Sequence, residues 1–448
     1  MLTSISTIIA GVVFLTMVYS RITSIKEKEK RAAMIFFSLG IILPIIFLLP
    51  SLCPYPLNEI LGGFFALLFF LVILISFFPF HQKLRTEGIV PREKIDERDT
   101  MFSRNILEPG SENYQAYYTR HPEKQPLDDA FRKNPGLLEK GTAFYDKNIF
   151  KAATANFDII EANRAFVTGN TAETKEQQEA RQSTEFIQNL VKKMGANSVG
   201  ITELKDYHLY SHRGRDHNYG EKVKNTHKYA IAFTVEMDHD FIRNAPYALA
   251  ILESSRQYVR SGIIAIRFAQ YIRKMGYDAR AHIDGEYEVV CPLVARDANL
   301  GEIGRMGLLM TPNLGPRVRI AVVTTSMPLV PDIRKEDSSM IDFCTTCKKC
   351  AEVCPSNAIA FDDRKKLNGV LRWQINQEAC FTYWTKTGTD CGRCISVCPY
   401  SHPSNKLHNV VRYGIKNSPL FRLMAVKMDD LFYGRKPKPL KLPEWYKS

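Results

Sequence analysis

The chain has 448 residues, of which 45% are hydrophobic and 24% are charged, and its formal net charge is +13. This length predicts two to four domains, and the composition fits a globular protein with an added membrane segment. A basic balance can mark nucleic-acid binding, a membrane surface or an acidic partner. No nucleic-acid motif is present and the charge is spread along the chain, so we expect no nucleic acid among the partners.

Three apolar runs occupy the first 82 residues, at about 2–19, 32–52 and 57–80. Each is close to the ~20 residues that a helix needs to cross a bilayer. The runs have almost no polar face, which a soluble helix bundle would need. We therefore expect a three-helix transmembrane anchor over 1–82. A secretory signal peptide fits poorly, and no Arg-Arg pair signals twin-arginine export.

Basic residues in the connecting segments predict the orientation of this anchor. The segment after the second run, 50–56, has no Lys or Arg, whereas the other two carry Arg21, Lys26, Lys28, Lys30, Arg31, Lys83 and Arg85. The positive-inside rule then places everything after residue 81 in the cytoplasm, as part of a multi-pass protein of the inner membrane. Glu59, the one acid in or beside an apolar run, is either a functional residue or an interfacial one.

Beyond the anchor, a polar extension over 83–180 is expected to wrap the core. Helices and strands then alternate, which predicts a mixed fold, α/β or α+β, with helices packed on a sheet. The expected helices are 152–166, 183–194 and 246–275, and the expected strands are 198–201, 229–235, 288–293 and 318–324. The glycine-rich segment 301–307 does not have the spacing of a dinucleotide site.

Eight of the ten cysteines lie in two runs at short spacings. The first run has the C-x2-C-x2-C-x3-C-P spacing of bacterial ferredoxins, in which the fourth cysteine binds the other cluster. One [4Fe–4S] cluster is therefore assigned Cys344, Cys347, Cys350 and Cys398, and the second is assigned Cys354, Cys380, Cys391 and Cys394. Zinc is the disfavoured alternative. Cys53 and Cys291 stand alone and are expected to be small buried hydrophobic residues.

A candidate catalytic face lies on the expected long helix. Ser254 and Tyr258 are four residues apart and share a face, which also carries the small residues Ser261, Gly262 and Ala265. This leaves room for a broad flat ligand, unless Tyr258 is an ordinary core tyrosine. Arg317 and Arg319 would share one face of a strand. A guanidinium beside a tyrosine hydroxyl favours the phenolate, although either arginine could instead form a surface salt bridge.

Together these segments resemble the corrinoid-dependent reductive dehalogenases over roughly 185–405. The resemblance is carried by both cysteine runs, by 300–319 with its Gly-Pro-Arg-Val-Arg end, by 327–332 and by 210–215. It implies a nitroreductase-like α/β core that holds a corrinoid, at 181–335, and a ferredoxin-like domain at 336–405, followed by a tail at 406–448.

The resemblance also implies site residues. Tyr258 matches the family's proton donor and Arg319 the basic residue that assists it, while Ser254 stands where threonine is usual. The cofactor-binding residues that it implies are Ser254, Tyr210, His212, Arg305 and Arg317. The stretch 282–287, His-Ile-Asp-Gly-Glu-Tyr, replaces a Ser-Gly-Asn-Asp segment near the family's pocket. No Asp-x-His-x-x-Gly motif is present, so the corrinoid is expected to bind without a protein histidine.

The implied function is reductive cleavage of a carbon–halogen bond in an organohalide. The implied partners are the lipid bilayer and an electron donor, which is a quinol-linked protein, a ferredoxin or a flavodoxin. One alternative is an epoxyqueuosine-reductase-like corrinoid enzyme, against which Tyr258 and the anchor argue. Another is a non-catalytic iron–sulfur subunit of a membrane complex. The sequence does not specify the organohalide, a respiratory or detoxifying role, or the oligomeric state.

Overall fold

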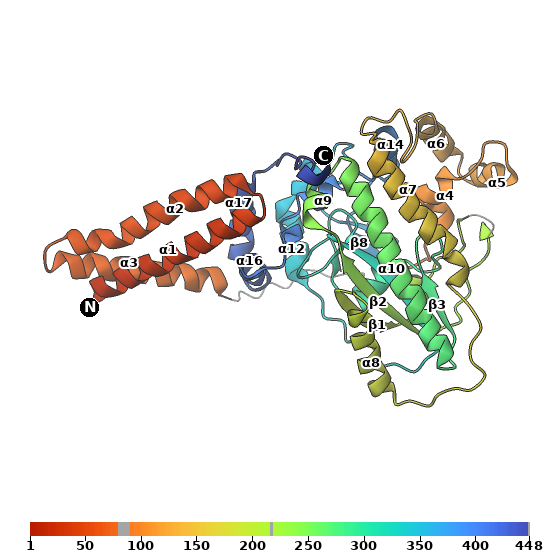
Figure 1. Cartoon of the computed structure of the whole chain (residues 1–448), viewed down its shortest axis with the longest axis horizontal. Coiled ribbons are helices and arrows are strands. Elements are labelled where there is room, and N and C mark those ends of the chain that lie inside the picture. The colour runs from red at the N-terminus through yellow and green to blue at the C-terminus, as the bar shows by residue number, and fades with distance from the viewer. Residues whose placement is uncertain (79–89, 216–217, 447–448) are drawn as a thin grey trace. The chain divides into compact units, whose positions relative to one another are not determined.

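The computed structural model describes residues 1–78, 90–215 and 218–446 and divides into two compact units. Unit 1 comprises Met1–Leu84 and Pro403–Pro437, and unit 2 comprises Arg85–His402 and Lys438–Ser448. Their elements are drawn in Figure 1. The predicted end of the third apolar run at 79–80, and the basic residues at 83 and 85, lie outside the described residues.

Unit 1 contains the three predicted apolar helices, which are confirmed. They are α1 (Leu2–Lys26), α2 (Lys30–Leu48, extended by a 3₁₀ turn to Leu52) and α3 (Leu57–Phe77). Each is long and apolar enough to cross a membrane. Their large apolar side chains are widely exposed, as a lipid-facing surface requires.

Glu59 lies in the first turn of α3 and binds the start of α1. Its carboxylate accepts hydrogen bonds from the Leu2 amide at 2.8 Å and from Thr3 Oγ1 at 3.0 Å. One turn later, a Cβ on Gly62 would lie 2.8 Å from the Thr3 backbone, so α1 and α3 approach closely there. These contacts favour the structural role for Glu59.

The structure does not keep the predicted tail at 406–448 as one segment. It divides these residues between the two units. The helices α16 (Lys406–Asn417) and α17 (Pro419–Tyr433) belong to unit 1, and only residues from Lys438 onward belong to unit 2. The physical reason is apolar packing: the rings of Phe36 on α2 and Phe432 on α17 stack at 4.3 Å.

The core of unit 2 is an antiparallel four-stranded sheet in the order β1-β2-β6-β3. The strands are β1 (Ser198–Glu203), β2 (Tyr229–Glu236), β3 (Ala279–His282) and β6 (Val318–Thr325). Side chains alternate across the sheet, so Phe233 and Val323 enter one hydrophobic cluster, whereas Ala232 and Val322 enter another.

Helices cover both faces of this sheet. On one side α10 (Ala248–Lys274) packs against α7 (Lys147–Ala162) and the strands, as Figure 1 shows, and α8 (Ala180–Lys193) joins the same cluster. On the other side lies α11 (Cys291–Asp297). This antiparallel arrangement is an α+β sandwich, in agreement with the predicted mixed fold.

The remaining elements of unit 2 are short. They are α4 (Met101–Asn105), α5 (Glu112–Arg120), α6 (Gln125–Arg132), α9 (His239–Arg243), β4 (Glu302–Ile303), β5 (Leu309–Met310), α12 (Ser338–Cys347), α13 (Lys349–Glu352), β7 (Lys365–Leu367), β8 (Val370–Arg372), α14 (Gln377–Thr387) and α15 (Arg393–Ser396).

Three of the four predicted strands and all three predicted helices are confirmed, whereas the strand at 288–293 is wrong. That segment turns into α11, whose first turn accommodates Pro292, and only Val289 forms an isolated bridge, with Leu209. The sequence prediction also missed β3, since Ala-Arg-Ala-His alternates without a strong apolar signal.

Candidate active site

Tyr258 and Arg319 meet between α10 and β6. Side chains alternate along β6, so Arg319 lies on the same face of the strand as Ala321 and Val323. These two residues belong to the hydrophobic cluster that contains α10. The guanidinium carbon of Arg319 lies 4.7 Å from the centre of the Tyr258 ring, which is a cation–π contact. The predicted pair of residues is therefore in contact.

Ser254 and Asp390 hold the guanidinium of Arg319. Arg319 Nη2 donates to Ser254 Oγ at 2.5 Å and to Asp390 Oδ2 at 3.1 Å, and the Ser254 hydroxyl donates to the same carboxylate oxygen. Because Asp390 directly precedes Cys391, this network joins the Tyr258 face to the second cysteine run. Sequence reasoning missed Asp390, since no spacing pattern relates it to the long helix.

Opposing charges act on the Tyr258 hydroxyl. The positive charge of Arg319 has the largest influence and lowers the pKa of Tyr258. Burial and the negative charges of Asp284 and Asp390 together outweigh it, so the pKa of Tyr258 is raised above its ordinary value. Tyr258 therefore keeps its proton at neutral pH.

Three tyrosines lie in the interior of unit 2. Tyr210, Tyr258 and Tyr287 lie deep among protein atoms, yet each retains solvent-accessible surface. None of their hydroxyls has a hydrogen-bond partner within the described parts of the chain. Burial, Asp284 and Tyr258 raise the pKa of Tyr287. An aromatic-lined interior with a few converging polar groups fits a large planar cofactor.

The small residues of α10 do not provide the room that was expected over Tyr258. A Cβ on Gly262 would collide with the Ile160 side chain of α7, and Ala265 lies in the hydrophobic core. Helix α7 fills this side. Tyr287 and Arg319 lie close enough to Tyr258 for their charges to interact with it.

Arg305 and Arg317 bind backbone carbonyls in the structure, and a corrinoid contact of either stays a prediction. Arg305 donates to the carbonyl oxygens of Cys344 at 3.0 Å, Ala360 at 2.7 Å and Asp362 at 2.9 Å. Arg317 donates to the Ser401 carbonyl at 2.7 Å and to that of Met237, and it pairs with Glu236. These hydrogen bonds connect both arginines to the backbone of the segment that carries the cysteines, Arg305 at Cys344 and Arg317 at Ser401.

The histidines near the expected pocket are also engaged. His212 Nδ1 lies 3.1 Å from Ser211 Oγ and 3.3 Å from Asp96 Oδ2. His208 is buried, with Nε2 at 2.9 Å from Asp297, and its Nδ1 accepts from the Lys205 amide. A corrinoid contact of His212 or Tyr210 stays a prediction.

The cysteines of the two runs lie close to one another, and their crosswise assignment to two clusters stays a prediction. Burial raises the pKa of Cys398, and so do its neighbours Cys344, Cys347 and Cys350. Burial likewise raises the pKa of Cys394, whose neighbours include Cys354, Cys380 and Cys391, but also Cys350 of the first predicted group. Buried thiolates need a cationic partner, which an iron–sulfur core supplies.

Zinc stays the disfavoured alternative on the spacing of the cysteines. One zinc ion would draw four thiolates to about 2.3 Å from one centre, whereas a cubane spreads them over four irons. Of the two isolated cysteines, Cys291 is buried as predicted, but Cys53 is partly exposed.

Comparisons with known proteins agree with this geometry. Residues 343–402 match the family model of a 4Fe-4S dicluster domain. Over 222 residues, or 48% of the chain, the sequence is 36% identical to tetrachloroethene reductive dehalogenase of Sulfurospirillum multivorans, covering 44% of that protein.

Solved structures share the fold. The catabolic reductive dehalogenase NpRdhA superposes with a TM-score of 0.64 at 23% identity, over 80% of this chain and 49% of that one. A reductive dehalogenase structure described as suggesting a mechanism for B12-dependent dehalogenation superposes with a TM-score of 0.61, also at 23% identity and with the same coverage. The chain thus spans about half the length of these relatives. Over 222 residues the chain is thus similar in sequence to a reductive dehalogenase, and its fold is similar to that of solved reductive dehalogenases.

Proposed function

We propose that the chain is a membrane-anchored reductive dehalogenase. The reaction consumes an organohalide, two electrons and one proton, and it releases a halide ion and the dehalogenated product. The observation that carries this proposal is the Tyr258 face: Arg319 lies over the ring, and Asp390 links the face to the second cysteine run. Tyr258 itself is interior but keeps solvent-accessible surface.

Two [4Fe–4S] clusters and a corrinoid are the proposed cofactors. The two cysteine groups would hold the clusters, and the interior beside Tyr210, Tyr258 and Tyr287 would hold the corrinoid without a histidine ligand. When bound, the corrinoid supplies metal-centred chemistry at the carbon–halogen bond, and the clusters supply single electrons.

The protein contributes a positioned proton. Tyr258 would donate its hydroxyl proton to the substrate carbon, and its raised pKa keeps that proton in place until the transfer. Arg319 would then stabilise the resulting phenolate by its positive charge. Ser254 and Asp390 fix the guanidinium in position, so this stabilisation requires no rearrangement.

We further propose that unit 2 lies on the cytoplasmic side of the inner membrane, because the α1–α2 connection carries the basic residues. The extension 83–180 would wrap the core. Its Arg104 pairs with Glu378 on α14 at 2.6 Å, and its Glu97 accepts from the Gly214 amide at 2.7 Å.

The test is an anaerobic activity screen. The full chain, made with cobalamin supplied, is reduced and incubated with halogenated phenols and chlorinated ethenes, and halide ion and dehalogenated product are measured together. The control is the same protein made without a corrinoid. Release of halide ion and dehalogenated product in equal amounts would support the proposal. A chain that holds corrinoid and clusters but releases no halide from any substrate would leave only an electron-transfer role.

A further inference from the structure

The β7–β8 hairpin carries an exposed basic surface near the first cysteine group. We define this hairpin surface as Phe361, Arg92, Lys365, Lys366 and Arg372. Arg92 lies beside the hairpin turn, since its amide donates to the Asn368 carbonyl at 3.0 Å. Arg92 and Lys366 also line one shared depression with Asn368.

The four basic residues of this surface outnumber the three exposed acidic residues beside them, which are Glu93, Asp362 and Asp363. Lys365 and Arg372 are directly paired across the two strands, where like charges repel. Lys365 has only a distant, exposed ion pair with Asp362, at 3.9 Å. Arg92, Lys366 and Arg372 have no ion-pair partner in the described segments of the chain. An anionic partner would relieve this repulsion.

An exposed aromatic residue stands next to these charges. Phe361 is 49% exposed although its two neighbours are fixed: Arg305 binds the carbonyls of Ala360 and Asp362. A rigid, exposed aromatic side chain beside charge is typical of the centre of a protein interface.

Arg305 connects this surface to the first cysteine group. The same guanidinium that fixes the backbone around Phe361 also binds the Cys344 carbonyl at 3.0 Å. Its other face lies 4.7 Å from the ring of Trp373, which directly follows β8. Arg305 therefore connects the segment that precedes the hairpin to helix α12, which carries Cys344.

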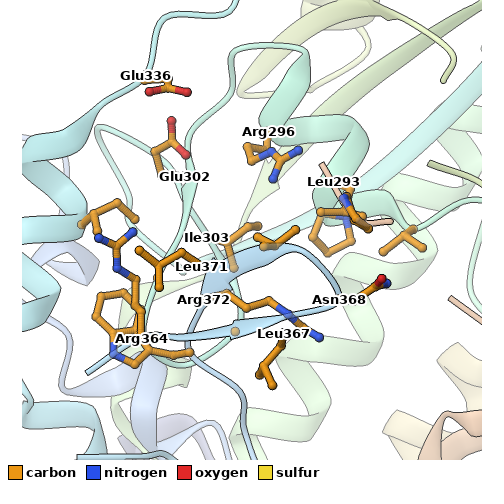
Figure 2. Close-up of a pocket in the computed structure, with 18 of the residues that line it drawn as sticks. Leu293, Arg296, Glu302, Ile303, Glu336, Arg364, Leu367, Asn368, Leu371 and Arg372 are labelled. Atoms are coloured by element: carbon orange, nitrogen blue, oxygen red, sulfur yellow. The ribbon is translucent and has the colours of Figure 1, made fainter. Parts of the chain in front are cut away.

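A cavity of about 220 Å³ lies between the hairpin and the core of unit 2. Figure 2 shows Ile303 between Arg296 and Arg372 along its wall. Gly304 lines the same cavity, and a Cβ on Gly304 would lie 3.5 Å from Cys344 Sγ. The lining of the cavity carries both charges, since Glu302, Glu336 and Asp337 lie on it together with Arg372.

We propose that the hairpin surface is the docking site of an acidic one-electron carrier protein, of the ferredoxin or flavodoxin class, which reduces the cluster bound by Cys344, Cys347, Cys350 and Cys398. The inference rests on the proposed function, because it requires that this cluster is present. The step is a single electron transfer: the carrier is oxidised by one electron, the cluster is reduced by one, and no covalent bond changes. Two such steps supply the electrons for one carbon–halogen cleavage.

Stopped-flow reduction of the clusters tests this proposal without using dehalogenation. The oxidised full chain is mixed with reduced flavodoxin, and bleaching of the iron–sulfur absorbance is followed at low and high salt. The test variant reverses three exposed charges, Arg92→Glu, Lys365→Glu and Lys366→Glu. The matched control makes the same charge change on α8, with Arg181→Glu, Lys192→Glu and Lys193→Glu.

We expect the hairpin variant to react about tenfold or more slowly with flavodoxin at low salt, because electrostatic steering changes association rates by ~10–10³-fold. The α8 control should react at the wild-type rate. Reduction by methyl viologen, a small cationic donor, should not be slowed in either variant. Phe361→Ala should weaken carrier binding without affecting reduction by methyl viologen.

Equal flavodoxin rates in the wild type and the hairpin variant would overturn the proposal. It would also be overturned if the hairpin variant lost only binding to phosphatidylglycerol vesicles, since the surface would then be a membrane contact. Failure of the proposed function looks different: a chain without clusters would show no bleaching with methyl viologen.

Discussion

Arg305 and Arg319 belong to one segment of the sequence but serve two regions of unit 2 in opposite ways. Arg305 donates its hydrogen bonds to backbone carbonyls, around Cys344 and next to Phe361, and it also lies over the ring of Trp373, which does not titrate. Arg319 binds the side chains of Ser254 and Asp390 and lies over the ring of Tyr258. A carbonyl cannot change its charge, so Arg305 fixes a conformation. A tyrosine can lose a proton, so the charge of Arg319 acts on chemistry.

The largest effect should come from removing a cysteine of either region. Cys344→Ser and Cys391→Ser should each lower the iron content from about eight to about four per chain and abolish dehalogenation, since each thiolate binds one iron of a cubane. Iron analysis and EPR spectra of the reduced protein measure this. Cys53→Ser, outside both groups, should keep all the iron. Loss of all iron in Cys53→Ser would contradict the assignment.

Tyr258→Phe should lower the dehalogenation rate by about 10²–10⁴-fold, the usual contribution of a positioned acid. The ring that contacts Arg319 is retained, so cofactor content should not change. Tyr271→Phe on the same helix is the matched control, and it should keep the wild-type rate. A Tyr258→Phe variant that dehalogenates at full speed would remove the proton-donor role.

Replacing either arginine by methionine should distinguish the structural role of Arg305 from the chemical role of Arg319. Arg305→Met should lower the free energy of unfolding by about 3 kcal/mol or more, because several buried carbonyls lose their donor. Arg319→Met should unfold near the wild-type temperature but dehalogenate about 10–100-fold more slowly, by loss of charge stabilisation. Thermal unfolding and steady-state rates distinguish the two. An Arg305→Met variant as stable as the wild type would contradict the structural role of Arg305.

The raised pKa of Tyr258 predicts an alkaline limb in the pH–rate profile. The donor form is the neutral phenol, so the rate should not fall because of Tyr258 until the pH exceeds the ordinary tyrosine value of about 10. Arg319 lowers this pKa, so Arg319→Gln should move the limb to higher pH. If the limb moved to lower pH in this variant, Arg319 would not lower the pKa of Tyr258 in the wild type.

Ser254 should give the smallest effect. Ser254→Thr keeps the hydroxyl that accepts from Arg319 and should stay within about twofold of the wild-type rate. Ser254→Ala loses the hydrogen bond from Arg319 and the one to Asp390, each worth about 1 kcal/mol, and should be about fivefold slower or more. Equal losses in both variants would show that bulk at this position matters more than the hydroxyl.

Local spacing explains what the sequence could predict. The cysteine runs, the Ser254–Tyr258 face and Arg319 are all defined by short intervals along the chain. Asp390 is 136 residues from Ser254, and only the folded chain brings the two together. The placement of α17 on α2 is also long-range and was missed. For Arg305, the sequence identified the residue but could not show that its hydrogen bonds end on carbonyls.

The most direct test is the metal and cofactor content of the anaerobically purified full chain, made with cobalamin supplied. We expect about eight irons and one cobalt corrinoid per chain, with corrinoid absorption bands superimposed on the iron–sulfur shoulder. A full complement of iron with no bound cobalt would contradict the account, because the interior beside Tyr258 would then not be a corrinoid site.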